Sequence, residues 1–151
     1  MRCDAIMNAD PVKARDSETL AHATELLLAH NLPGLPVVDA EGRYVGMFGA
    51  DELAALIVPR VALAGNITSN VRFIGDDMSR LVERYRDLKS QLLHEVADRN
   101  AVALSPTTPA IEAFRMFCRN RTPLAVVDPA NRKLVGVVSY ADVIKAIAEV
   151  A

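Results

Sequence analysis

Ser139 and Asp142 are spaced so that both side chains could contact one polar ligand. They stand at the expected start of the last helix, where free backbone amides would stabilise the Asp142 carboxylate. A carboxylate in this position can accept two hydrogen bonds from a diol, and the Ser139 hydroxyl can donate or accept a further one. The same spacing also fits a structural role, in which Ser139 caps the helix and Asp142 occupies its first turn. The residue types alone are compatible with both roles.

Residues that could perform catalysis or bind a metal do not form a recognisable pattern. His22, His30 and His94 make no HxH or HExxH motif, and the acidic residues do not cluster as metal ligands would. Cys3 and Cys118 have no CxxC spacing, which is typical of free thiols in a reducing compartment. We expect Cys118 to be a core residue rather than a nucleophile. The sequence therefore predicts no enzyme, no catalytic residue and no metal site.

Composition excludes several classes of partner. The 151 residues carry a net charge of −2, have 5% aromatic residues and contain no Trp, so neither a basic face nor a stacking surface for nucleic acid is expected. The longest apolar stretch, 53–63, is interrupted by Pro59 and Arg60 and is too short to span a bilayer. The N-terminus lacks the apolar run of a signal peptide. We expect a cytoplasmic protein that binds neither nucleic acid nor a membrane.

The chain contains the same pattern twice. Thr19, Asn31 and Asp39 recur 89 residues later as Thr108, Asn120 and Asp128, and Gly46 recurs 90 residues later as Gly136. Each copy predicts a short strand, a helix with a polar start, a hairpin and a closing helix. The hairpin strands are expected over 35–38 and 44–48 in the first copy, and over 124–127 and 133–138 in the second. Closing helices are expected over 51–57 and 141–150. One β-α-β-β-α unit is too small to bury its apolar face alone, so the two copies should pack together as an α/β fold.

A long amphipathic helix is expected between the copies. Asp76 and Asp77 suit the N-terminus of such a helix, and apolar residues then recur every three or four positions as far as Val96. This stripe consists of Met78, Leu81, Val82, Tyr85, Leu88, Leu92 and Val96. A helix over 76–96 could cover its own domain, or it could form a dimer or dock on a partner. Both interpretations stay open.

The order of elements, together with Leu-Pro-Val-Val-Asp at 35–39 and Gly-Val-Val-Ser-Tyr-Ala-Asp at 136–142, resembles the CBS domain, named for cystathionine β-synthase. The resemblance implies two tandem CBS repeats, 1–59 and 95–151, packed about a pseudo-twofold axis and joined by a loop and helix at 60–94. In that family, clefts between the repeats bind AMP, ADP, ATP or S-adenosylmethionine. The paired domains usually regulate another protein and do not catalyse a reaction.

The resemblance also assigns candidate ligand-binding residues. The family's ribose motif, Gly-apolar-apolar-Ser/Thr-x-x-Asp, is matched in the second copy by Gly136, Ser139 and Asp142. The same cleft would be lined by Ala103, Leu104, Ser105, Thr122, Pro123, Leu124 and Val137. The first copy has Gly49 and Glu52 at the motif's Ser/Thr and Asp positions, so we expect one competent and one degenerate cleft. The basic residue that contacts phosphate in some relatives is missing from this sequence. A ligand with little negative charge therefore stays an open alternative.

Two functions remain as hypotheses. The leading one is a regulatory ligand-sensing module, acting as a homodimer, that binds an adenosine-containing ligand (AMP, ADP, ATP or S-adenosylmethionine) in the second-repeat cleft and modulates a separate partner protein. It requires no cofactor. The alternative is a structural protein that dimerises through the middle helix and whose clefts bind nothing.

Overall fold

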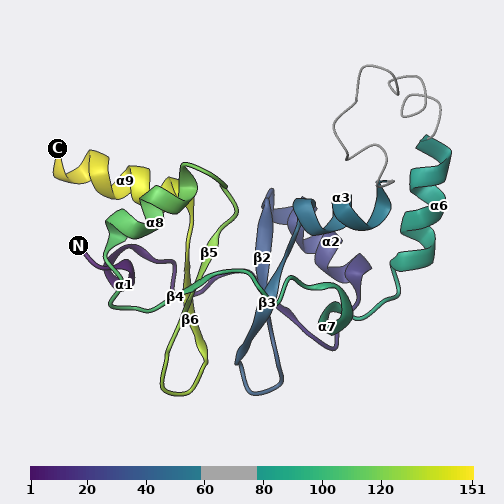
Figure 1. The fold of residues 1–151 in the computed structure, drawn as a ribbon, viewed down its shortest axis with the longest axis horizontal. Coiled ribbons are helices and arrows are strands. Elements are labelled where there is room, and N and C mark those ends of the chain that lie inside the picture. The colour runs from purple at the N-terminus through teal and green to yellow at the C-terminus, as the bar shows by residue number, and fades with distance from the viewer. Residues whose placement is uncertain (59–77) are drawn as a thin grey trace.

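The computed structural model describes residues 1–58 and 78–151. It consists of two similar halves that lie side by side, each with a three-stranded sheet and helices packed on it (Figure 1). In each half the first strand is parallel to the second, and the second and third form an antiparallel hairpin. Repeat 1 contains β1 (Ala14–Arg15), β2 (Gly34–Val38) and β3 (Tyr44–Gly49). Repeat 2 contains β4 (Ala103–Leu104), β5 (Leu124–Val127) and β6 (Leu134–Val138). The duplicated α/β fold predicted from the sequence is confirmed.

The helices follow the same duplication. Repeat 1 contains α2 (Leu20–His30) and α3 (Ala50–Ile57), and repeat 2 contains α8 (Ala110–Phe117) and α9 (Tyr140–Val150). The backbone amide of His22 donates to the Thr19 hydroxyl at 3.2 Å, which caps α2. Between and before these elements lie α1 (Cys3–Ile6), α6 (Met78–Leu88) and α7 (Leu93–Val96). No helix of the described ranges is long and apolar enough to cross a membrane.

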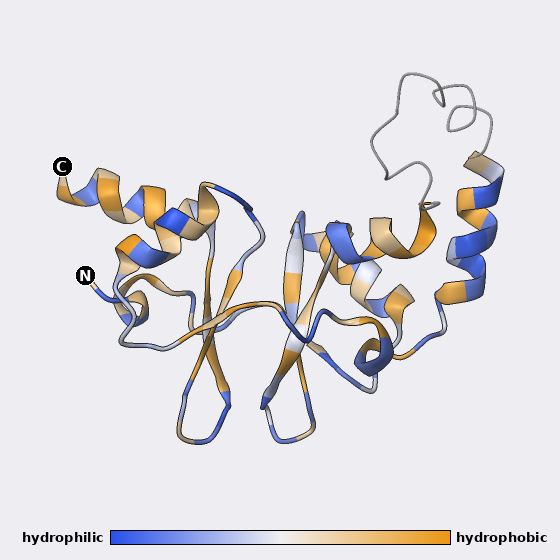
Figure 2. Cartoon of the chain, in the orientation of Figure 1, coloured by the Kyte–Doolittle hydropathy of each residue, from blue (hydrophilic) through white to orange (hydrophobic). Residues whose placement is uncertain are grey.

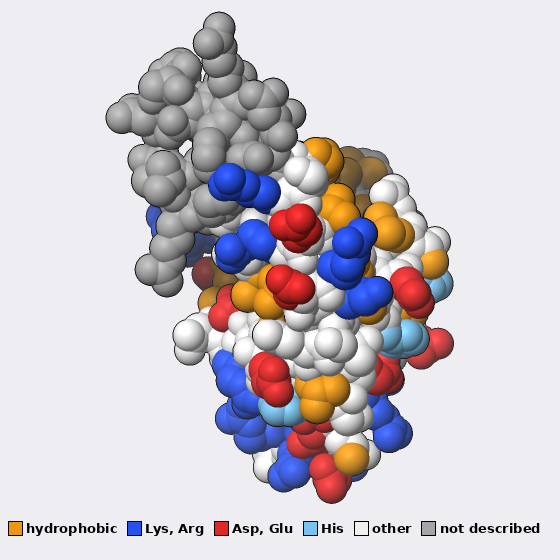
Figure 3. All heavy atoms as spheres, turned by 90° about the vertical axis from the view of Figure 1, so that its right-hand side faces the viewer, with side chains coloured by type: hydrophobic (Ala, Val, Ile, Leu, Met, Phe, Trp, Pro, Cys, Tyr) orange, Lys and Arg blue, Asp and Glu red, His pale blue; other side chains and the backbone are white. Residues whose placement is uncertain are grey.

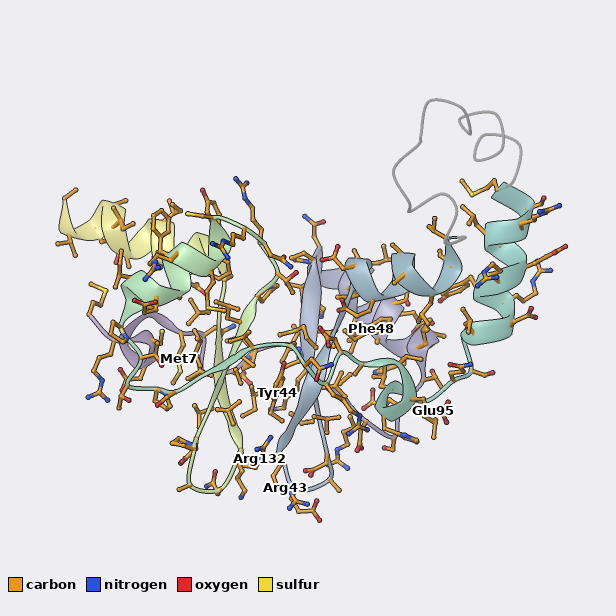
Figure 4. All side chains as sticks on the ribbon, viewed as in Figure 1. Met7, Arg43, Tyr44, Phe48, Glu95 and Arg132 are labelled. Carbon is orange, nitrogen blue, oxygen red and sulfur yellow. The ribbon has the colours of Figure 1, made fainter. Side chains whose placement is uncertain are left out.

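The two sheets meet along their hairpins. Tyr44, Met47 and Ala125 form a buried cluster that combines β3 with β5. At the hairpin ends the Tyr44 amide donates to the Arg132 carbonyl, and the Leu134 amide donates to the Gly42 carbonyl, both at 3.0 Å. Figure 4 shows the two polar hairpin ends, labelled by Arg43 and Arg132, next to each other. The halves are therefore joined through apolar packing and backbone hydrogen bonds.

Each repeat also receives a short helix from the chain that leads into the other repeat. Helix α1 is the first element of the segment that forms repeat 1, but Cys3 is buried in the core of repeat 2, and its amide donates to the Thr108 carbonyl at 2.8 Å. Helix α7 precedes repeat 2, but Leu93 is buried in the core of repeat 1, and its amide donates to the Glu18 carbonyl at 2.9 Å. This reciprocal exchange makes each hydrophobic core depend on both parts of the chain.

Gly46 and Gly136 lie where these exchanged segments cross the sheets. Met47 and Asp98 exchange two backbone hydrogen bonds, and Val137 exchanges two with Asn8. A Cβ atom at position 46 would lie 2.5 Å from the Asp98 carbonyl oxygen, and one at position 136 would lie 2.8 Å from that of Asn8. Such a close approach of two backbones requires glycine. The repeated glycine of the sequence pattern therefore serves the packing of the two repeats.

The continuous helix predicted over 76–96 is not confirmed. Asp76 and Asp77 lie outside the described residues, α6 ends at Leu88, and α7 begins only at Leu93. The intervening backbone pairs with the start of α2, because the carbonyls of Lys89 and Gln91 accept hydrogen bonds at 2.9 Å from the amides there. The apolar stripe in the sequence extends past Leu88 because the apolar residues of α7 also pack against repeat 1. They do so from a separate helix and not from a continuation of α6.

Helix α6 covers its own domain. Tyr85 and Leu88 pack against the core of repeat 1, and Nη2 of Arg84 donates to the carbonyl oxygen of Leu56 in α3 at 3.0 Å. Figure 3, which faces this side of the molecule, shows basic and acidic side chains over its surface. This packing agrees with the interpretation of the middle helix as a cover for repeat 1, and its role as a dimer-forming or partner-docking helix stays a prediction.

One expectation about the cysteines is wrong. Cys118 is exposed, because α8 ends at Phe117 and Cys118 follows as the C-terminal cap, on the side away from the core. Cys3 is the buried thiol, and burial raises its pKa, with a smaller contribution from the charge of Asp4. Both cysteines are free.

Candidate ligand-binding cleft

A cleft of about 420 Å³ lies between the two repeats. One wall comes from repeat 1 and holds Met47 of β3 and the first-turn acids Asp51 and Glu52 of α3. The opposite wall comes from the second half of the chain and includes Asp98, Val102 and the segment 122–124 at the start of β5. Apolar and polar side chains both line the cleft, and its volume is in the range of small-molecule sites.

Three of the nine candidate residues line this cleft, namely Thr122, Pro123 and Leu124. The others lie elsewhere in repeat 2. Leu104 and Val137 are buried residues of strands β4 and β6, and Ala103 lies beside Leu104 in β4. Ser105 belongs to a turn in which its hydroxyl and that of Thr107 are 3.1 Å apart.

Ser139 and Asp142 form hydrogen bonds with each other. The Ser139 amide donates to Oδ2 of Asp142 at 2.7 Å, the Ser139 hydroxyl donates to the same oxygen at 2.9 Å, and the Asp142 amide donates to the Ser139 hydroxyl at 3.1 Å. This is a capping box at the start of α9. The structural role that the sequence allowed is therefore present, and its hydrogen bonds to the Asp142 carboxylate use Oδ2.

Pseudo-twofold symmetry explains which segments meet. A Cβ atom at Gly34, where β2 begins, would lie 3.2 Å from Cγ2 of Thr122, which lies just before β5. The strand starts of the two repeats are thus adjacent, and segment 122–124 faces the α3 turn of repeat 1 rather than the α9 turn of its own repeat. Comparison of the two copies by sequence could not show that segment 122–124 faces the other repeat, because this arrangement depends on how the two repeats pack against each other.

The α3 turn differs from the α9 turn for a steric reason. Gly49 occupies the position that corresponds to Ser139, and a Cβ atom there would lie 2.2 Å from the Pro33 carbonyl oxygen. That oxygen accepts a hydrogen bond from the Ala50 amide at 3.0 Å. A serine at position 49 would require this strand pair to move apart. The departure from the motif is therefore fixed by the local packing of repeat 1.

The cleft is acidic at one end. Burial raises the pKa of Glu52, and the nearby charges of Asp51 and Asp98 raise it further, while the Glu52 and Gly49 amides partly offset these effects. The phenol of Tyr44 is influenced by two of these carboxylates, Asp98 and Glu52. Its pKa is raised to about 12, first by burial and then by Asp98 and Glu52. Three carboxylates and the guanidinium of Arg119 line this cleft, so its electrostatic balance is negative.

Within the described ranges, no group of three or more His, Cys, Asp or Glu side chains could hold a metal ion.

Comparison with known proteins agrees with this architecture. The CBS domain family model matches residues 3–59 and 93–149. A CBS domain-containing protein of Dictyostelium discoideum is 33% identical over 57 residues, which are 38% of this chain and 39% of that protein, so the match spans about two fifths of the relative's length.

Solved structures share the fold over nearly the whole chain. CBSX2 from Arabidopsis thaliana, solved in complex with AMP, has a TM-score of 0.70 and 20% identity, with 99% of this chain and 97% of that chain covered. The CBS domain pair of protein MJ0100, in complex with 5′-methylthioadenosine and S-adenosyl-L-methionine, has a TM-score of 0.66 and 22% identity, with 100% and 98% covered. The chain belongs to the CBS domain family and contains a tandem pair of CBS domains.

Proposed function

We propose that this protein is a non-enzymatic regulatory module that binds an adenosine-containing ligand in the cleft between its repeats and modulates a separate partner protein. The observation that carries the proposal is the cleft itself, because both repeats contribute its walls. Its fold is shared with CBSX2, solved with AMP, and with MJ0100, solved with 5′-methylthioadenosine and S-adenosyl-L-methionine. The net charge of −2 and the free thiols support a cytoplasmic protein that binds neither nucleic acid nor a membrane.

The wall residues have chemistry that suits a nucleoside. The Glu52 carboxylate, in the first turn of α3, can accept hydrogen bonds from two ribose hydroxyls. Val102, Met116 and Leu124 line the cleft with apolar side chains against which an adenine ring can pack. The Thr122 hydroxyl donates to Oδ1 of Asn120 at 2.7 Å, which orients it at the edge of the cleft.

Ser139 and Asp142 remain the candidate ribose contacts of a second, symmetry-related site at the α9 turn. A ligand there would share the Ser139 hydroxyl and the Asp142 carboxylate with the capping box. We therefore rank the α3 turn first as the ribose site and the α9 turn second. This ranking reverses the order that the motif match alone favours.

The charge of the cleft indicates which adenosyl ligand fits best. Three carboxylates and one guanidinium line it, so a sulfonium compound is favoured over AMP, and AMP over ATP. One extra positive charge about 5 Å from a carboxylate at a partly exposed site gains about 1–3 kcal/mol. S-adenosylmethionine should therefore bind about tenfold more tightly than S-adenosylhomocysteine, which has the same shape but a neutral sulfur.

Binding between the repeats offers a route to regulation. A ligand that contacts both walls fixes the packing of one repeat on the other. A partner that binds one packing arrangement better than another then responds to ligand concentration, because a ligand shifts an equilibrium by its differential affinity for the two states.

The decisive experiment measures the thermal midpoint of the purified protein with S-adenosylmethionine, S-adenosylhomocysteine, AMP and ATP. A ligand that binds only the folded state stabilises it by about 2.7 kcal/mol at a hundredfold excess over its dissociation constant. The Glu52→Ala and Asp142→Ala variants form a matched pair, since each removes the carboxylate of one turn. We expect the stabilisation to disappear in Glu52→Ala and to persist in Asp142→Ala.

The alternative function is a structural protein with clefts that bind nothing. The mutual hydrogen bonds of Ser139 and Asp142 favour it, because they give both residues a role without a ligand. Absence of stabilisation by every one of the four ligands would support this alternative and contradict the adenosyl proposal.

A further inference from the structure

The hydroxyl of Tyr44 is a polar group buried between the two repeats without a hydrogen-bond partner. The residue is 8% exposed, and its hydroxyl oxygen forms no hydrogen bond within the part of the chain that the structure describes. Figure 2 shows mainly hydrophobic strands in both sheets and hydrophilic hairpin ends, and Figure 4 shows Tyr44 between the sheets. A buried hydroxyl that lacks a partner destabilises the folded state, so its presence at this position needs an explanation.

A β-bulge turns Tyr44 toward repeat 2. The register of β2 and β3 shifts between Gly46 and Tyr44, so Val45 has no partner opposite it. In a regular strand the side chains alternate, and residues 44 and 47 would point to opposite faces. The extra residue instead places Tyr44 and Met47 together in the buried cluster between the repeats, while Val45 packs against the core of repeat 1. Bulges often redirect side chains in this way beside a functional site.

The second copy has the same bulge but no hydroxyl. Leu134 stands 90 residues after Tyr44, the offset that also relates Gly136 to Gly46, and it packs against the same cluster between the repeats. The register of β5 and β6 shifts at the equivalent place. A leucine is therefore sufficient for the packing that this position requires. The hydroxyl of Tyr44 is not needed to join the repeats, which favours a role in binding.

Tyr44 lies one layer behind the wall of the cleft. Met47 belongs to its cluster and Ala101 packs against that cluster, and both of these residues line the cleft. Burial, and then the charges of Asp98 and Glu52, raise the pKa of the Tyr44 phenol to about 12. At neutral pH the hydroxyl therefore keeps its proton and can donate a hydrogen bond. The carboxylates of the cleft disfavour an anionic acceptor, so the matching atom on a ligand should be neutral.

The base of an adenosyl ligand supplies such an acceptor. Glu52, at the α3 turn, is our candidate ribose contact, whereas Tyr44 lies at the opposite end of β3. Ala101 is adjacent to Val102, one of the side chains against which the adenine ring can pack. A base on that wall lies beside Met47, whose unbranched side chain can change its rotamer and let a ring nitrogen reach the hydroxyl behind it.

We propose that the Tyr44 hydroxyl donates a hydrogen bond to a ring nitrogen of the adenine base and so contributes to the selection of adenosyl ligands. This inference rests on the proposed function and adds recognition of the base to it. The hydroxyl is already shielded from solvent in the ligand-free protein. The new hydrogen bond therefore does not replace one from the hydroxyl to water, and its contribution to affinity is undiminished on the protein side.

Tyr44→Phe removes the hydroxyl and keeps the ring. Isothermal titration with S-adenosylmethionine and with AMP compares this variant with the parent protein and with Tyr85→Phe, the same change on α6 outside the cleft. We expect binding to weaken about three- to tenfold in Tyr44→Phe, the value of one hydrogen bond, and to stay unchanged in Tyr85→Phe. The thermal midpoint of ligand-free Tyr44→Phe should equal or exceed that of the parent, because the hydroxyl removed has no partner.

A second measurement identifies the accepting atom. Adenosine and its 1-deaza, 3-deaza and 7-deaza analogues, each of which lacks one ring nitrogen, are titrated into the parent protein and into Tyr44→Phe. The analogue that lacks the accepting nitrogen should bind both proteins equally, while the other three compounds should bind Tyr44→Phe about three- to tenfold more weakly.

The possible failures are distinguishable. A parent protein that no adenosyl ligand stabilises contradicts the proposed function and this inference together. Equal affinities of the parent and Tyr44→Phe for the ligands that bind contradict the role of Tyr44 alone. A lower thermal midpoint of ligand-free Tyr44→Phe would show that the hydroxyl already serves the fold, and an equal loss of affinity for adenosine and all three analogues would show that the acceptor is not in the base. Either result would overturn the inference.

Discussion

Replacement of Leu93 by alanine tests the exchange of short helices between the repeats. Leu93 lies in the segment that connects the two copies, yet it is 0% exposed and packs with Leu20 and Leu27 in the core of repeat 1. The substitution removes three carbon atoms, which at about 0.8 kcal/mol each gives a transfer term of about 2.4 kcal/mol. The cavity left in a core that can only partly relax raises the expected loss of unfolding free energy to about 3–4 kcal/mol.

Urea unfolding followed by circular dichroism measures this loss. Leu28→Ala is the matched control, since the same atoms are removed from a side chain that is 78% exposed, and it should change the unfolding free energy by less than about 0.5 kcal/mol. The slope of free energy against urea must stay unchanged for the comparison to hold. Equal and small losses for Leu93→Ala and Leu28→Ala would refute the exchange, because a leucine of a loosely attached linker would behave in that way.

Two further predictions concern glycine packing and pH. Gly46→Ala should lower the unfolding free energy by about 1–3 kcal/mol, because the added Cβ would lie 2.5 Å from the Asp98 carbonyl oxygen, and a thermal midpoint unchanged from the parent protein would contradict the crossing of the two backbones. The folded-state pKa of Glu52 lies above its ordinary value of 4.5. Its contribution to the free energy of unfolding is therefore fully present below about pH 4.5 and is lost as the pH rises through the folded-state pKa. Glu52→Gln should therefore stabilise the ligand-free protein at pH 7 but not at pH 4, as measured by urea unfolding at both pH values. Equal effects at the two pH values would show that the Glu52 carboxyl is not perturbed.

The regular elements of each repeat could be predicted from sequence because local features determine them. The apolar run expected as a strand over 35–38 is β2, Gly34–Val38, and the closing helix expected over 141–150 is α9, Tyr140–Val150. A continuous apolar run specifies a strand that is buried on both faces. A Ser at the N-cap and an acid in the first turn specify where a helix begins. These signals are close together in the sequence and do not depend on the rest of the fold.

The short helices α1 and α7 could not be predicted in the same way. Each is four residues long, below the length at which helix propensity or periodicity is informative. They are stabilised by tertiary contacts, with Cys3 in the core of repeat 2 and Leu93 in the core of repeat 1. The apolar residues of α7 instead extended the helical stripe of α6 in the sequence. That coincidence produced the prediction of one long helix.

The two turns of the candidate site hold their carboxylates differently, which is why our proposal ranks them in the opposite order to the motif match. The turn that matches the ribose motif uses its own hydroxyl and carboxylate to cap α9, so Ser139 and Asp142 stabilise the ligand-free fold. The turn that departs from the motif has no hydroxyl at position 49. Burial, and then the charges of Asp51 and Asp98, raise the pKa of Glu52, while the amides of Glu52 and Gly49 partly offset this. A ligand that donates hydrogen bonds or brings positive charge would relieve that unfavourable environment. This difference between the two turns is the physical reason for our proposal that an adenosyl ligand binds at the α3 turn.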